Sequence, residues 1–155
     1  MDHELRTRVL EVYAEVDAAV AAAKPRCDAS GRCCRFTEYG HTLFLSQFEA
    51  DILLETAPAY SKPVTRDFCP FQVNGLCTAR ESRPLGCRIY FCDPTFQEPQ
   101  HAITEAAVAK LKAIADEYET GWNYAPLHVQ LNAANSADPE ASPKARECRI
   151  GLNVF

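Results

Sequence analysis

Cysteine constrains this chain more than any other residue type, because seven of its eight cysteines fall between positions 27 and 92. The seven are Cys27, Cys33, Cys34, Cys69, Cys77, Cys87 and Cys92. Their density over the whole chain is below the roughly 8–10% that marks small disulfide scaffolds. The first four residues, Met1 to Glu4, are acidic and do not resemble a basic export signal. We therefore expect a cytoplasmic chain whose clustered, reduced cysteines act as metal ligands or redox groups.

The rest of the composition is that of an ordinary folded domain. The chain has 155 residues, of which 47% are hydrophobic and 24% charged, so one domain with a hydrophobic core is expected. Its formal net charge of -5 offers no basic surface for nucleic acid. No apolar run approaches the roughly 18 residues of a membrane-spanning helix. Neither a nucleic acid nor a membrane is therefore an expected partner.

Hydrophobic spacing predicts a small, α-rich domain of the α+β class with three main helices. Apolar residues recur at intervals of three and four over residues 2–24 and 99–120, as on one face of a helix. A third helix is expected over 47–56, because Ser46 and Glu49 have the spacing of a capping box. The three helices would surround a cysteine cluster built from loops.

A short β-hairpin is expected beside the cysteines. Asn74 and Gly75 form the strongest short-range hairpin signal, with apolar residues on both sides of them. Cys69 and Cys77 lie near the two ends of this hairpin. Over residues 83–92 the sequence predicts a turn followed by a short apolar run. The cysteines therefore fall in loops and at the ends of elements. From such places ligands can converge on a metal ion from several directions.

The sequence predicts a single domain over residues 1–134, with the cysteine motif in residues 25–93. Residues 135–147 contain no large apolar side chain and are expected to form a flexible linker. A C-terminal tail over residues 148–155 follows. It carries the eighth cysteine, Cys148, which we expect to lie outside the site.

The number of cysteines does not decide which metal is bound. One tetrahedral zinc ion or one [4Fe-4S] cluster takes about four thiolates and would leave three of the seven cysteines spare. Two tetrahedral zinc ions need about eight bonds, which seven thiolates supply if one sulfur bridges both ions. His41 or Cys148 could fill that last place instead. His101 and His128 lie far from the cysteines in sequence and are expected to be surface or core residues.

Two further features bear on the chemistry of the thiols. Cys33 and Cys34 point to opposite sides in an extended segment, so they are expected to serve different ions, or one ion and one reactive thiol. Seven arginines lie within a few residues of a cysteine, and guanidinium groups can hydrogen-bond thiolates and offset their charge. They are Arg26, Arg32, Arg35, Arg66, Arg80, Arg83 and Arg88.

The full pattern resembles a known family. The residues that carry the resemblance are Cys27-x2-Ser30-Gly31-x-Cys33-Cys34-Arg35-Phe36, Cys69-Pro70-Phe71, Cys77, Arg83-Pro84-x2-Cys87-Arg88 and Cys92. They resemble the YkgJ-type cysteine-cluster family, whose motif is CxxCxxCC, over about residues 25–93. The resemblance implies a protein that chelates zinc or iron through Cys27, Cys33, Cys34, Cys69, Cys77, Cys87 and Cys92. Some relatives, among them flagellin lysine methylases, carry the motif, so it also allows an iron-sulfur cluster with redox or methyl-transfer activity.

One position departs from the family pattern, because Ser30 stands where the motif has its second cysteine. Serine is a poor ligand for zinc or iron at neutral pH, so we do not count Ser30 as a ligand. No Gly-rich turn follows a predicted strand, as a complete methyl-donor site would require. We therefore expect a metal-binding module more than a stand-alone enzyme, with a protein partner left open. A thiol redox sensor built on Cys33 and Cys34 is a third hypothesis.

Overall fold

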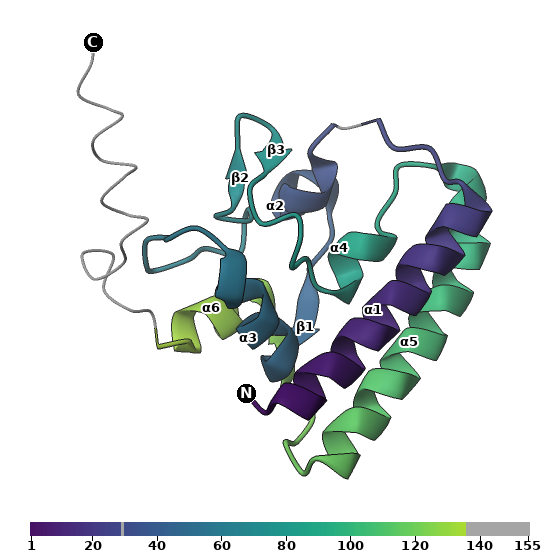
Figure 1. The fold of residues 1–155 in the computed structure, drawn as a ribbon. Helices are drawn as coiled ribbons and strands as arrows, with labels where there is room; N and C mark the ends of the chain where they lie inside the picture. The colour runs from purple at the N-terminus through teal and green to yellow at the C-terminus, as the bar shows by residue number, and fades with distance from the viewer. Residues whose placement is uncertain (29, 136–155) are drawn as a thin grey trace.

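The computed structural model describes residues 1–28 and 30–135. Two long helices, α1 (His3–Ala23) and α5 (Gln97–Glu117), lie side by side and antiparallel along one flank of the molecule (Figure 1). The Asp2 side chain caps the first of them by accepting hydrogen bonds from the backbone N–H groups of Glu4 and Leu5. Salt bridges between Arg8 and Glu117 join the two helices at one end.

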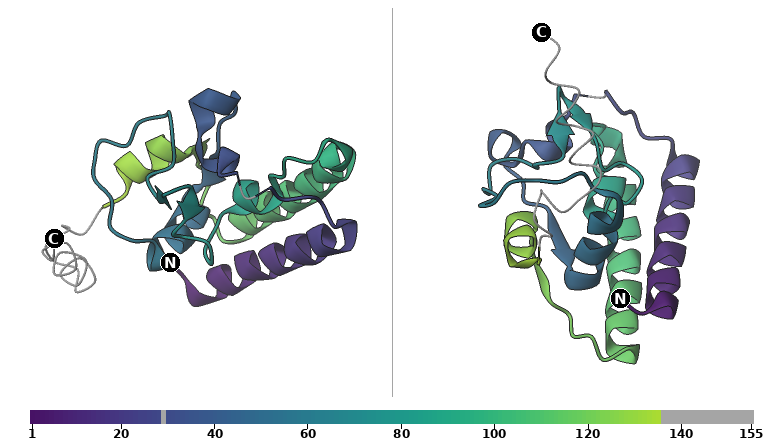
Figure 2. Two further views of the ribbon diagram at one scale, coloured as in Figure 1. Left: turned by 90° about the horizontal axis from the view of Figure 1, so that it is seen from above. Right: turned by 60° about the vertical axis from the view of Figure 1, so that its left-hand side comes forward.

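The two long helices share one hydrophobic core. From α1 it contains Val9, Val12 and Val16, and from α5 it contains Leu111 and Ile114. These side chains recur every three or four residues, so they form one stripe on each helix. The remaining elements lie on one side of this helix pair, as the views in Figure 2 show.

A second hydrophobic core lies in the half of the molecule that contains both strands and helices. Strand β1 (Phe44–Ser46) pairs antiparallel with β4 (Tyr124–Pro126), in a register that places Leu45 opposite Ala125. Helix α3 (Gln47–Thr56) follows β1 directly, and α6 (Leu127–Ala133) follows β4. Leu45, Leu53 and Leu131 of these elements are buried together in this core. Segments about 80 residues apart in sequence thus meet in one layer.

The cysteines lie on short elements and loops, and five of them belong to the second core or pack against it. In chain order these elements are the 3₁₀ helix η1 (Arg32–Cys34), α2 (Phe36–Tyr39), the hairpin of β2 (Gln72–Val73) and β3 (Leu76–Cys77), α4 (Leu85–Ile89), and the 3₁₀ helix η2 (Pro94–Phe96). Asn74 and Gly75 both have positive φ, at 51° and 76°, as a tight hairpin turn requires. The hairpin predicted from this dipeptide is therefore confirmed.

The expected fold class is confirmed, with two local differences. The helix expected over 99–120 begins at Gln97 and ends at Glu117, because Glu119 takes a left-handed conformation and the Thr120 N–H bonds to the Ala115 carbonyl. The turn and apolar run expected over 83–92 contain helix α4 instead. The end of the domain, where sequence spacing does not distinguish strand from helix, contains one of each, β4 and α6.

Two further expectations concern the C-terminal segment and membrane-spanning helices. Apart from Asn135, the linker expected over 135–147 and the tail expected over 148–155, which includes Cys148, lie outside the described residues. Among the helices of the described part, none combines the length and apolar character needed to cross a membrane.

Candidate metal centre

Six of the seven predicted ligands line one cavity of about 220 Å³. They are Cys27, Cys33, Cys34, Cys77, Cys87 and Cys92. They come from the loop after α1, from η1, from the hairpin strand β3, from α4 and from the segment after α4. Segments up to 65 residues apart in sequence therefore bring their thiols to one place. All seven cysteines of the described part are free thiols.

Cys33 and Cys34 lie on the same side of the chain, so the expectation that they point apart is wrong. Their sulfur atoms are 3.8 Å apart. The reason is local, because residues 32–34 form a 3₁₀ helix and not an extended segment. A zinc–sulfur bond of about 2.3 Å in a tetrahedral site separates two sulfurs by about 3.8 Å. The spacing of this pair therefore suits two ligands of one ion.

Cys69 lies behind Cys34 and does not line the cavity. Its backbone N–H donates a hydrogen bond of 2.8 Å to the Cys34 carbonyl, and its side chain is buried. The Cys69 side chain also contributes to raising the pKa of Cys34. Cys69 is therefore joined to Cys34 through the backbone but is not among the residues that line this cavity.

The thiols influence one another's ionisation. The hydrogen bond from Cys33 lowers the pKa of Cys34, but the Cys69 thiol and burial outweigh it and raise this pKa to about 12. The hydrogen bond with Cys34 raises the pKa of Cys33, and burial raises the pKa of Cys87, with further contributions from the thiols of Cys34, Cys33 and Cys77. Without a cation these thiols are therefore neutral at pH 7. A bound metal ion would reverse this balance and release protons.

Ser30 lies in the same cavity, although it is not a cysteine. Its hydroxyl oxygen is 3.7 Å from the sulfur of Cys92. Cys27, on the same loop, is exposed. Ser30 therefore places a hydroxyl among the thiols.

Arginine divides into two groups around the cavity. Arg26 pairs with Asp28, Arg35 with Glu38, and Arg88 with Asp17, so these three are held by carboxylates. Three others line the cavity itself, namely Arg32, Arg80 and Arg83. Arg66 is exposed and does not line it. Sequence proximity to a cysteine thus identified some cavity arginines but could not separate them from the paired ones.

His41 stands beside the cavity and not in it. Its ring stacks on Tyr90 with 4.6 Å between the ring centroids, and its Nε2 is 3.3 Å from the Cys33 carbonyl oxygen. Its Nδ1 is buried without a hydrogen-bond partner. The ring lines a neighbouring cavity of about 210 Å³, which shares Cys33, Cys87 and Tyr90 with the first. His101 and His128 line neither cavity.

The structure also adds a residue that sequence reasoning did not single out. Gln72 lines the thiol cavity, and its side-chain N–H donates a hydrogen bond of 2.9 Å to the Gly31 carbonyl. This bond joins the hairpin to the loop before η1. Its place on the first strand of the hairpin, beside the Asn74–Gly75 turn, is the only sequence signal for it.

The described histidine, cysteine, aspartate and glutamate side chains contain no group of three already arranged to hold a metal ion. The thiols line a common cavity but do not yet converge on one point. Side-chain rotation would have to draw them together around an ion. The donor set is nevertheless suitable, because thiolates are the ligands that zinc and iron-sulfur clusters prefer.

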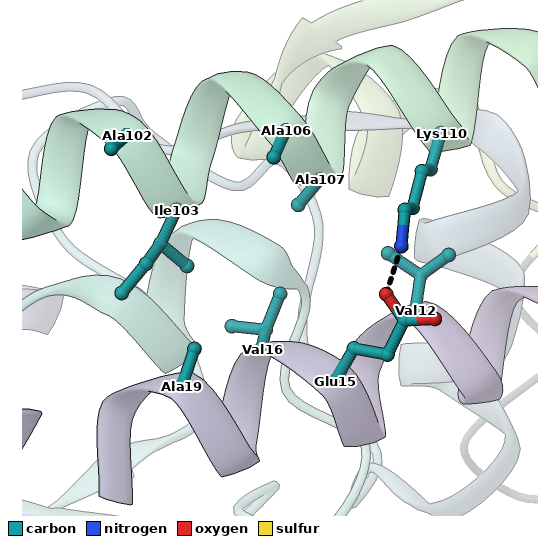
Figure 3. Close-up of a pocket in the computed structure, with 9 residues that line it drawn as sticks. All are labelled: Val12, Glu15, Val16, Ala19, Ala102, Ile103, Ala106, Ala107 and Lys110. Atoms are coloured by element: carbon teal, nitrogen blue, oxygen red, sulfur yellow. Dashed lines mark hydrogen bonds and ion pairs between the residues drawn. The ribbon is translucent and has the colours of Figure 1, made fainter. Parts of the chain in front are cut away.

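Another hollow, between α1 and α5, has different chemistry (Figure 3). It has a volume of about 300 Å³ and is lined mostly by small apolar side chains. Its charged groups are Glu15 and Lys110, which pair with each other across the groove. The lining residues include no thiol or histidine. The thiol cavity is therefore the better candidate for a functional site.

Comparison of the chain with family models, curated proteins and solved structures gave no significant match.

Proposed function

We propose that this protein binds a metal ion, zinc or iron, through cysteine thiolates in the thiol cavity. The observation that carries the proposal is the convergence of six cysteines from separate segments on one cavity of about 220 Å³. Buried hydrophobic cysteines would not need to share a cavity with charged arginines. The resemblance to the YkgJ-type cysteine-cluster family, whose members are associated with zinc or iron, supports the same conclusion.

Four thiols form the core of the proposed site: Cys33, Cys34, Cys77 and Cys87. The 3.8 Å spacing of the first pair suits a tetrahedral ion. Cys77 and Cys87 line the same cavity as this pair. Cys27 and Cys92 lie on the same cavity and supply thiolates for a second ion. A [4Fe-4S] cluster would use four thiolates of the same set.

The chain's own residues provide the conditions for such a site. The thiols supply soft ligands, and three guanidinium groups on the wall offset the negative charge that thiolates leave around a divalent ion. When bound, zinc would hold the segments together and iron in a cluster would exchange electrons. We propose a binding module, whose metal is structural or is carried as cargo.

The decisive experiment is metal analysis of untagged protein purified without oxygen, together with its visible absorption spectrum. We expect a colourless protein with one or two zinc ions per chain. A brown protein with equal amounts of iron and sulfide would instead favour an iron-sulfur cluster, with redox or methyl-transfer chemistry. Protein with an intact fold, free thiols and neither metal would overturn the proposal.

A pair of cysteine variants tests the location of the metal. Cys87→Ser removes a thiol from the core of the cavity and is expected to lower the bound metal by at least about half. Cys148→Ser removes the one cysteine that the sequence places outside the motif, and its metal content should stay at the wild-type value. Circular dichroism of both variants separates loss of metal from loss of fold. Equal metal content in both would exclude the cavity as the site.

A further inference from the structure

Three arginines without a carboxylate partner surround the thiols. Within the described residues, Arg32, Arg80 and Arg83 form no salt bridge, although all three line the cavity. The half-buried Arg83 uses only its Nε, which donates to the Arg80 carbonyl at 3.1 Å. The Arg32 guanidinium lies over the Tyr39 ring, 5.1 Å from its centroid. Most of their N–H donors are therefore available to a ligand.

The surroundings of these arginines are unusual for this chain. Among the described residues, no aspartate or glutamate lines the thiol cavity, even though the whole chain carries a net charge of -5. Elsewhere in the described part, arginines such as Arg6 and Arg8 are paired with glutamates. Uncompensated positive charge is therefore concentrated at the mouth and wall of one cavity, where it attracts anions.

A bound metal ion with its thiolates would not neutralise all the positive charge of the three arginines. Four thiolates around one zinc ion leave about two negative charges, and six thiolates around two zinc ions leave about the same. The three guanidinium groups therefore neutralise the zinc–thiolate group and leave about one positive charge in either case. An anion is thus favoured beside one bound ion or two.

We propose that Arg32, Arg80 and Arg83 form a docking site for a small carboxylate-bearing ligand that exchanges the metal with the thiol cavity. This inference rests on the proposed function. The arginines would bind the carboxylates, bidentate for a guanidinium, while a donor atom of the ligand reaches the ion. Cys27 is exposed on the same cavity, so the ion can be reached from solvent.

The exchange step balances without any redox partner. When the incoming ligand is a thiol, its sulfur gives up a proton and forms a bond to the metal. One cysteine thiolate leaves the metal and takes up a proton. The metal keeps its oxidation state, and repetition of the step moves it from protein to ligand. The arginines contribute by holding the negatively charged ligand beside the ion.

The simpler alternative is that the arginines only offset thiolate charge. Their removal would then weaken the site equally toward every competing ligand. A docking site instead predicts that removal acts on anionic ligands and spares neutral ones. Two thiols that differ in carboxylates therefore separate the two explanations.

The test measures zinc transfer from zinc-loaded protein to mercaptosuccinate and to 2-mercaptoethanol, at equal thiolate concentration and constant ionic strength. Zinc left on the protein is measured by elemental analysis after rapid desalting. We expect mercaptosuccinate to remove zinc about tenfold faster, because the arginines raise its local concentration. The double variant Arg80→Gln, Arg83→Gln should lose this difference. Arg66→Gln, which removes an arginine outside the cavity, should keep it.

Equal rates for the two thiols in the wild-type protein would overturn the inference. So would a double variant that releases zinc faster to both thiols while their ratio stays unchanged. Calorimetric titration of reduced, metal-free protein with succinate tests the docking site without any metal. Wild-type protein should bind succinate and the double variant should not. Absence of succinate binding overturns the docking site, whereas absence of metal in the purified protein overturns only the proposed function.

Discussion

Glu49 is a buried carboxyl that connects three parts of the fold. It is 1% exposed, and its oxygens accept hydrogen bonds from the Tyr13 hydroxyl at 3.1 Å and the Leu85 N–H at 3.0 Å. They also accept bonds from the Ser46 N–H and hydroxyl, at 2.9 Å and 3.0 Å. The capping box identified this residue in the sequence as a local cap. Its contacts to α1 and α4 depend on the tertiary structure.

Replacement of Glu49 by Gln is expected to destabilise the protein by about 1–3 kcal/mol, because an amide N–H₂ would face hydrogen-bond donors. Burial raises the pKa of Glu49 in the folded state above its usual 4.5. The wild-type protein therefore loses the contribution of this group as pH rises from about 4.5 through the folded pKa, and the Gln variant does not. Denaturant unfolding of both proteins from pH 4 to pH 8 should show that the difference between their free energies of unfolding becomes smaller as pH rises. A gap that stays constant or widens would contradict this.

At the scale of elements, the hairpin and the loop before η1 meet at Gly31. This residue has a φ of 70°, and a Cβ there would lie 2.5 Å from the Gln72 side-chain nitrogen and 3.0 Å from the Gly75 carbonyl oxygen. A side chain at Gly31 would therefore push the hairpin, which carries Cys77, away from η1, which carries Cys33 and Cys34. The close approach of these elements shapes the cavity.

Gly31→Ala is expected to lower both stability and bound metal, and Gly40→Ala provides a matched control. Gly40 has a similar φ of 66° but nothing within 4 Å of an added Cβ, so it should cost only the left-handed strain of about 1–2 kcal/mol. Gly31→Ala should cost at least about 1 kcal/mol more, because of the contact with the hairpin. Denaturant unfolding and metal analysis measure the two effects. Equal metal content in both variants would show that this contact does not shape the site.

At the scale of the whole molecule, two separate clusters of buried side chains stabilise the chain. The α1–α5 cluster contains no cysteine, whereas the second cluster includes Cys34 and Cys69 and packs against Cys33, Cys77 and Cys87. A metal ion would therefore stabilise one half of the molecule directly. The other cluster joins the paired long helices to side chains of α3 and α4, and it would not contact the metal.

Removal of the metal by a chelator is expected to lower Tm while most of the helical circular dichroism at 20 °C remains. A ligand at about 100 times its Kd contributes about 2.7 kcal/mol, which for a chain of this size is about 5–10 °C in Tm. Differential scanning calorimetry with and without chelator measures the shift. Complete loss of helical signal on chelation would mean that the long helices also depend on the metal. An unchanged Tm would mean that no metal stabilises the fold.

The sequence by itself determined the elements whose stability is local. Apolar periodicity and capping residues specify α1, α3 and α5, and the Asn74–Gly75 turn specifies the hairpin, because these signals act within a few residues. The chemistry of the thiols was also readable from their identity. Strands β1 and β4, of three residues each, were not specified in this way, because such strands are stable only when a distant partner pairs with them.

Only the tertiary structure decided how the cysteines and arginines are grouped. The 3₁₀ turn at Arg32–Cys34 turns two neighbouring thiols to the same side, and the fold separates Cys69 from the cavity that the other six share. It also pairs Arg88 with Asp17 while leaving Arg83 without a carboxylate among the described residues. Sequence spacing carries no information on such distances, because they depend on how segments from both cores pack against each other.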